Sequence, residues 1–157
     1  MSTLKVDTIQ GKTTAGTVAM PSGMVIQTVQ ESTTTQLIHN STSYGVTSIS
    51  ASITPKFSSS KILVTITSNM EGNAAGEIGF YAIFRDSTNI AQSQIGQASG
   101  TSGSPIFPIA IQKLDSPSTT SSVTYALYVK KTTSAIVANI NTGGNSDGVI
   151  TLMEIKQ

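Results

Sequence analysis

The sequence predicts an all-β protein, an antiparallel β-sandwich preceded by an extended N-terminal arm. The clearest observation is the strict alternation of apolar and polar residues between Val123 and Lys130, which is the period of two of a half-buried strand. Turn residues separate similar segments at intervals of about ten to fifteen positions. No window of about twelve residues carries the i, i+3, i+4, i+7 pattern of an amphipathic helix. Strands without helices bury their apolar faces against one another, so two stacked sheets are expected.

Residues 1–23 are expected to form an arm and linker outside the sandwich. Leu4, Val6 and Ile9 supply the apolar positions of one short strand-like segment, and a Gly-containing link follows it. Pro21-Ser22-Gly23 then stops any second short strand. This stretch is too short to build a core of its own. We therefore predict that Leu4, Val6 and Ile9 dock the arm on another protein by strand pairing.

Residues 24–157 are expected to form the sandwich domain. Pro108 indicates an edge position for its strand, and the residues from Asp86 to Asn89 have hairpin-turn chemistry. A second turn is predicted at Asp115, Ser116 and Pro117, and the Gly/Ser-rich stretch from Gly96 to Ser104 is predicted to be a loop. About ten strands without intervening helices favour a jelly roll. The expected strands are Met24–Gln30, Thr33–His39, Gly45–Thr54, Lys61–Ser68, Glu77–Arg85, Ile90–Ile95, Ile106–Lys113, Val123–Lys130, Ala135–Asn141 and Gly148–Lys156.

Several strands carry apolar residues on both faces. In the last strand, Ile150 and Leu152 face one way, whereas Val149, Met153 and Ile155 face the other. Either loops cover the second face, or that face packs on a neighbouring subunit, since apolar area left exposed on a monomer usually marks an interface. The residues predicted to lie at a subunit interface are Ala126, Tyr128, Met153 and Ile155.

The composition excludes several classes of protein. Charged residues make up 11% of the 157 residues, well below the roughly 25% of an average soluble domain, and the net charge is +1. Scattered basic residues do not form the stripe that nucleic-acid binding requires. The absence of cysteine excludes disulfides and thiolate metal sites. No apolar run is long enough for a membrane span and no secretory signal is seen, so we expect synthesis in a cytoplasm without membrane insertion.

A search for reactive residues finds only weak candidates. His39 is the single histidine and is read as a polar residue at a strand end, without a nucleophile motif beside it. Glu71 and Glu77 flank a Gly-rich loop and keep a polysaccharide-cleaving enzyme open as an alternative, although solvation at the surface is the simpler role. Tyr44 is the one candidate for stacking on a sugar, and the alternative is that it packs at the edge of the core. We predict no enzyme activity, no catalytic or metal-binding residue and no cofactor.

Four segments also resemble known sequences, in a fixed order. They are residues 4–30 (LKVDTIQ…GTVAMPSGMVIQTVQ), Phe57–Thr67 (FSSSKILVTIT), Phe80–Gln92 (FYAIFRDSTNIAQ), and Leu114–Lys130 followed by the closing ITLMEI of Ile150–Ile155. Each is similar to a segment of the small fibre-like virion proteins of marine and cyanobacterial tailed phages. These proteins carry an LKVNTIQ-like arm, a PAGHVIQ-like entry, an SSSKVLV strand, an FRLYRDGT-I hairpin and a closing strand.

The resemblance implies a virion protein whose head domain is a jelly roll of the tumour necrosis factor and C1q type. Such heads usually form homotrimers, so the partners implied are further copies of this chain and other virion proteins of the capsid, tail or portal region. Host cell-surface glycans are an additional implied partner. No long shaft separates arm and head, so a short fibre is expected rather than a full tail fibre. The alternative within this resemblance is a capsid decoration protein that stabilises the shell.

Overall fold

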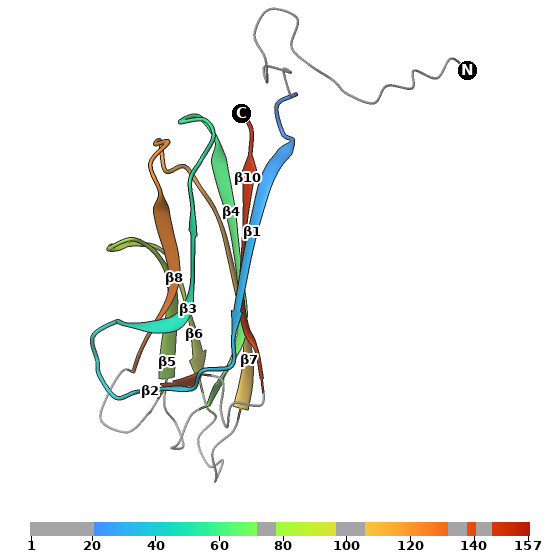
Figure 1. Cartoon of the computed structure of the whole chain (residues 1–157). Coiled ribbons are helices and arrows are strands. Elements are labelled where there is room, and N and C mark those ends of the chain that lie inside the picture. The colour runs from blue at the N-terminus through green and yellow to red at the C-terminus, as the bar shows by residue number, and fades with distance from the viewer. Residues whose placement is uncertain (1–20, 72–77, 97–105, 132–137, 141–145) are drawn as a thin grey trace, which may run out of the picture.

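The protein is described by a computed structural model, which covers residues 21–71, 78–96, 106–131, 138–140 and 146–157 (Figure 1). These residues form ten strands and contain no helix. The strands are β1 (Val25–Thr33), β2 (Leu37–His39), β3 (Gly45–Ile53), β4 (Lys61–Glu71), β5 (Ile78–Arg85), β6 (Thr88–Gly96), β7 (Ile106–Asp115), β8 (Val123–Lys131), β9 (Ala138–Ile140) and β10 (Gly148–Ile155).

The strands form two antiparallel sheets that pack face to face, which confirms the predicted β-sandwich (Figure 1). Sheet A has the main order β7-β4-β10-β1, and the short strands β9 and β2 extend it at one end. Sheet B has the order β3-β8-β5-β6. Among the eight long strands the first pairs with the last, the second with the seventh, the third with the sixth and the fourth with the fifth. This nested pairing is the topology of a jelly roll.

The core lies between the two sheets and is built from their inward faces. From sheet A, Ile62, Val64 and Ile66 of β4 are fully buried. Sheet B contributes the predicted apolar face of β8, where Tyr125 and Leu127 are also inaccessible. The alternation that was read from the sequence therefore sets which side of each strand is buried, because successive side chains of a strand point to opposite faces.

Two local predictions agree with the observed connections. Pro108 lies in β7, which pairs only with β4 among the described strands and so forms an edge of sheet A. Proline has no backbone N–H, and on the unpaired side of an edge strand this absence costs no hydrogen bond between strands. The β5–β6 hairpin turns at Asp86 and Ser87, and Asp86 has a positive φ of 51°, which Asp tolerates better than most residues.

Two other predictions are wrong. The strand expected over Thr33–His39 is broken, since β1 runs through Thr33 and β2 begins only at Leu37. The turn expected at Asp115 is displaced, because Asp115 is the last residue of β7 and is 9% exposed. Its carboxylate does not bond locally. It pairs instead with Arg85 and with the hydroxyl of Tyr125, two residues of sheet B. These contacts hold the end of β7 against the opposite sheet.

The described residues leave some predictions outside their range. Leu4, Val6 and Ile9 of the arm lie outside them, as do Glu77, most of the predicted loop from Gly96 to Ser104, and the first part of the strand expected over Ala135–Asn141.

Candidate functional site

Among the described residues, the candidates for catalysis are not brought together. His39 lies at the end of β2, as expected, and its Nε2 is 2.9 Å from the carbonyl oxygen of Ser43. Glu71 is half-buried in β4, and its proposed partner Glu77 lies outside the described residues. Within the described ranges, no group of three or more His, Asp or Glu residues could hold a metal ion. The remaining candidate sites among the described residues lie on the outer faces of the two sheets.

The four predicted interface residues lie on opposite outer faces of the sandwich. Met153 and Ile155 of β10 point away from the core on sheet A, because Leu152 and Glu154 between and beside them point inward. Ala126 and Tyr128 occupy the corresponding outward positions of β8 on sheet B. A single flat contact with a neighbouring subunit cannot include both pairs. Ala126 is in addition only 6% exposed, so it offers little area to any partner.

The outer face of sheet A carries an apolar ridge made of Met153, Leu63 and Leu114. The strand register places Met153 opposite Leu63 and Leu63 opposite Leu114, so the three side chains form one row across β10, β4 and β7. Leu114 is 46% exposed. At the β1 side, Val25 lies opposite Ile155 and is 49% exposed, which extends the apolar area beyond the ridge.

A shallow hollow lies beside this ridge on the same sheet. It has a volume of about 330 Å³ and is lined by Thr65, Ala110, Ile111 and Gln112. The row next to Leu63 and Leu114 pairs Thr65 with Gln112, and the row beyond it pairs Thr67 with Ala110, so short side chains on both strands leave space there. The outer face of sheet A thus carries one apolar row beside a hollow, with Thr28, Thr65 and Gln112 as polar neighbours of that row.

The outer face of sheet B carries an aromatic cluster made of Tyr44, Phe80, Phe84 and Tyr128. The rings of Phe84 and Tyr128 stack with centroids 4.0 Å apart and an interplanar angle of 23°. Tyr44 meets Phe84 edge to face, at 5.4 Å and 63°. The cluster is built from β5, β8 and the residue just before β3, and all four side chains are partly exposed.

A single cation lies over this aromatic cluster. The Nζ atom of Lys130 is 4.6 Å from the ring centroid of Tyr44 and 5.0 Å from that of Phe80, within cation–π range of both rings. The Tyr44 hydroxyl donates to Oε1 of Gln92 at 3.2 Å, and Asn89 donates to the same oxygen at 3.2 Å. Partial burial raises the pKa of Tyr44, so this hydroxyl stays protonated and remains a donor.

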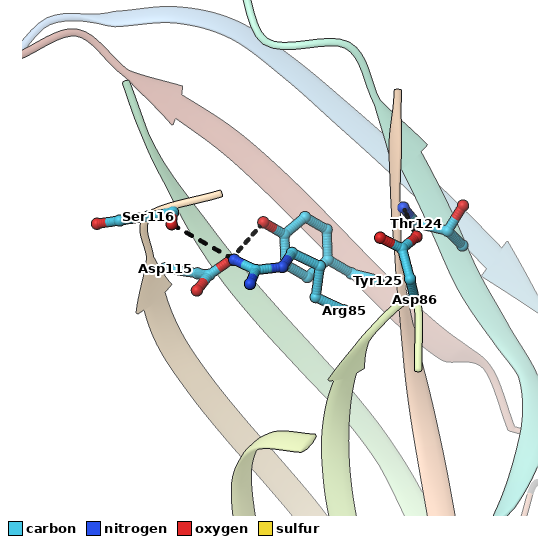
Figure 2. Close-up of polar contacts among 6 residues, drawn as sticks. All are labelled: Arg85, Asp86, Asp115, Ser116, Thr124 and Tyr125. Atoms are coloured by element: carbon cyan, nitrogen blue, oxygen red, sulfur yellow. Dashed lines mark hydrogen bonds and ion pairs between the residues drawn. The ribbon is translucent and has the colours of Figure 1, made fainter. Parts of the chain in front are cut away.

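A polar cluster closes one end of the sandwich and joins the two sheets (Figure 2). Arg85 of β5 pairs with the Asp115 carboxylate of β7 at 2.7 Å, and the Tyr125 hydroxyl donates to the same carboxylate oxygen at 2.7 Å. Burial, together with this hydrogen bond, raises the pKa of Tyr125 above its usual value near 10.0. The three side chains thereby link β5 and β8 of sheet B to β7 of sheet A.

A second buried carboxylate was missed by sequence reasoning. Glu154 is fully buried, and its Oε1 accepts from the backbone N–H groups of Lys56 and Phe57 at 2.8 and 3.3 Å. Its Oε2 accepts from the amide of Gln27 at 2.6 Å. Glu154 thereby holds the β3–β4 connection against β10 and β1. The available signal was its position, since it continues the inward alternation of Ile150 and Leu152.

A polar groove of about 390 Å³ lies along one side of the sandwich, where the edge strands β1 and β3 face each other. Ser48, Ser50 and Ser52 line it from β3, and Glu31, Ser32 and Thr33 line it from β1. Its hydroxyl groups make this side of the molecule hydrophilic, in contrast to the outer face of sheet A.

Comparison with known proteins gives no family and no close relative. No protein-family model matches the chain, and no curated protein matches it. Three of the solved structures that match the chain are similar to it only weakly, and the chain spans 14% and 43% of the length of the first and third. The first is dimeric latent PorU of Porphyromonas gingivalis, with a TM-score of 0.44 and 10% identity over 88% of this chain. The second is a Bacillus endospore appendage from a family of disulfide-linked pili, with a TM-score of 0.36 and 8% identity over 91% of this chain and 100% of the other. The third is the Gt strain of infectious bursal disease virus, with a TM-score of 0.42 and 12% identity over 95% of this chain. Likenesses at these TM-scores and identities indicate neither function nor descent.

The described part of the chain has no helix that is long and apolar enough to cross a membrane.

Proposed function

We propose that this chain is a structural protein of a bacteriophage particle, a short fibre whose sandwich domain forms a homotrimer and whose N-terminal arm docks on the particle. The observation that carries the proposal is the apolar ridge of Met153, Leu63 and Leu114 on the outer face of sheet A. A monomer would leave this ridge in water, and contiguous apolar area on a protein surface usually marks a contact with another protein. The four segments similar to phage fibre-like proteins give the context.

The outer face of sheet A fits self-association better than the outer face of sheet B does. On sheet A, the ridge residues are aliphatic and Leu114 is 46% exposed. On sheet B, the aromatic rings already contact one another and Lys130. A cation borders the apolar area of sheet A as well, since Lys61 lies opposite Ile155, so the free aliphatic ridge and not the charge distinguishes the two faces. Of the predicted interface residues, we therefore retain Met153 and Ile155 for the homotrimer.

The ridge and the hollow lie side by side on one face of sheet A, so a ridge on one copy can enter the hollow of another. Both a two-fold contact, in which the two copies exchange ridge and hollow, and a closed ring satisfy this arrangement. Three copies is the number that the fibre-like resemblance implies.

The arm would attach the trimer to the particle by adding a strand to another virion protein. Leu4 and Val6 would lie on one side of this segment and Ile9 on the other, and a strand added to a sheet uses such apolar side chains to fill pockets. The arm precedes β1, which pairs only with β10 among the described strands, so the arm begins at an edge of sheet A.

Deletion of residues 2–20 tests the docking role. We expect a folded oligomer that no longer joins particles, and full incorporation of the truncated chain would contradict the arm assignment. A sharper version replaces Leu4 and Val6 together by serine, with Lys5→Ser plus Asp7→Ser as the matched control on the other side of the same segment. Only the apolar replacement should reduce the amount of chain per purified particle.

Electron cryomicroscopy of the same particles tests the fibre assignment against the alternative of capsid decoration. A fibre is expected as density at the tail or at a few vertices. Density spread regularly over the whole shell would contradict the fibre and favour a decoration protein, while leaving the sandwich and its self-association unchanged.

A further inference from the structure

We propose that the aromatic cluster on the outer face of sheet B binds an acidic polysaccharide, with Lys130 receiving a carboxylate group of the sugar and the rings receiving its C–H faces. The inference rests on the proposed function, in that self-association through sheet A leaves sheet B facing outward. It also assigns Tyr128 to a ligand surface and not to a subunit contact.

The cluster places half of the aromatic residues of this chain on one solvent face. The chain contains four Phe and four Tyr residues and no Trp, and this cluster holds Phe80, Phe84, Tyr44 and Tyr128. In the register the cluster is bordered by Val46, Ala82 and Ala126 and by the amides of Gln92 and Gln94. Serines and threonines supply the outward positions of β3 and β8 nearer the other end.

The charge of this face favours an anionic ligand. Among the described residues, no carboxylate pairs with Lys130, and the outward positions that the register aligns across β3, β8, β5 and β6 carry no Asp or Glu. The two rings that flank Nζ hold the ammonium group in place. An anion that binds there therefore meets a cation that has already lost most of its rotamer freedom, which lowers the entropic cost of binding.

The remaining groups fit the hydroxyls and ring hydrogens of a pyranose. The negative face of an aromatic ring attracts the slightly positive C–H hydrogens of a sugar ring. Gln92 receives both of its hydrogen bonds on Oε1, and no described residue accepts from its amide nitrogen, which leaves this nitrogen as a donor for a sugar hydroxyl. Gln94 lies opposite Phe80 in the register and is exposed, so a second amide borders the rings.

The test measures binding of the full chain to alginate oligosaccharides, which are polyuronates, and to dextran, a neutral glucan, at low and high salt. We expect binding to alginate that weakens with salt and binding to dextran that is at least tenfold weaker, because screening reduces only the charged contribution. Lys130→Gln should weaken alginate binding by roughly tenfold. Lys113→Gln removes the same charge from exposed β7 and should leave binding unchanged.

Tyr44→Leu separates the contribution of the rings from that of the charge. This residue precedes β3, so its replacement leaves the strand ladder intact, and it should weaken binding by roughly tenfold without changing the salt dependence. Thermal melting of each variant checks that the fold is retained. If a variant fails to fold, the comparison of alginate with dextran on the wild-type chain remains decisive.

Equal binding of the two glycans, equal effects of Lys130→Gln and Lys113→Gln, or no alginate binding by the wild-type chain would each overturn the inference. The oligomeric state is measured on the same samples. A chain that self-associates and joins particles but does not bind alginate would contradict the glycan site alone, whereas a monomer that binds alginate would contradict the proposed fibre alone.

Discussion

Glu154→Gln replaces a buried carboxylate by an amide of nearly the same size and tests how the β3–β4 connection is held. The carboxylate accepts three hydrogen bonds, two from the backbone of Lys56 and Phe57 and one from the Gln27 amide. An amide has only one oxygen. If that oxygen serves the backbone N–H groups, the new NH₂ group faces the NH₂ group of Gln27, and two donors then meet.

Rotation of the Gln27 amide does not remove the conflict. Its nitrogen also donates to the carbonyl oxygen of Thr54 at 2.8 Å, so a flip that offers oxygen to the new amide abandons that bond. At least one hydrogen bond is lost in either arrangement, and the others lose the charge of their acceptor. Hydrogen bonds to a charged group contribute about 1.5–3 kcal/mol each, and relief of carboxylate desolvation offsets part of the loss. We expect a net destabilisation of about 2 kcal/mol.

Urea denaturation at fixed protein concentration measures this loss, because self-association makes the apparent stability depend on concentration. A loss of about 2 kcal/mol corresponds to a fall in melting temperature of roughly 4–8 °C in a chain of this size. Glu31→Gln is the matched control, since Glu31 is an exposed carboxylate on β1 and should change stability by less than about 0.5 kcal/mol. Equal stabilities of the two variants, within that margin, would refute the proposal that the Glu154 carboxylate holds the β3–β4 connection.

Three further perturbations test the packing of the sandwich. Burial raises the pKa of Tyr125 above 10.0, so its contribution to the free energy of unfolding is complete below about pH 10 and is lost as pH rises toward the folded-state pKa. Tyr125→Phe should therefore flatten the alkaline fall in the free energy of unfolding relative to wild type. A parallel fall in both proteins would contradict this assignment. Gly45→Ala should cost about 1–3 kcal/mol, because an added Cβ would lie 2.2 Å from the ring of His39, and the added change His39→Ala should restore most of the loss in a double-mutant cycle. Ser60→Ala should be neutral or stabilising by up to about 1 kcal/mol in urea denaturation, since the Ser60 hydroxyl is buried without a hydrogen-bond partner; a loss above about 1 kcal/mol would indicate a partner.

The sandwich could be predicted because its central strands β4, β8 and β10 largely follow the period of two. In β8, the residues at the predicted inward positions, such as Tyr125 and Leu127, are fully buried. In β10, the inward and outward sides of Ile150 and Met153 are those that the alternation indicates. Local pattern decides these features because each strand needs only one apolar side to be covered by the opposite sheet.

The pairing of distant residues could not be predicted from local pattern. Asp115 followed by Ser116 and Pro117 has the composition of a turn, yet its carboxylate is captured by Arg85, thirty positions away in the other sheet. Likewise, the interface prediction treated Tyr128 and Met153 as members of one surface. Only the strand order, which places β8 and β10 in different sheets, assigns them to opposite faces.

The aromatic cluster shows the same limit. Tyr44, Phe80 and Tyr128 are far apart in the sequence, and each has an ordinary explanation as a residue at the edge of the core. The register of β8 with β5 aligns Lys130 with Phe80, and β3 brings Tyr44 beside them. The sequence identifies Tyr44 as a candidate for stacking but does not show which other aromatic rings lie beside it.

The mass of the chain in solution, measured by light scattering, tests most directly whether the outer face of sheet A is a subunit contact. The account predicts a trimer of about 49 kDa, three times the 16.3 kDa of one chain. Leu114→Glu should reduce this mass to that of the monomer, because it places a charge on the ridge. Val46→Glu, at a comparably exposed apolar position on sheet B, should leave the trimer intact. A wild-type chain that stays at 16.3 kDa, or equal effects of the two substitutions, would contradict the account.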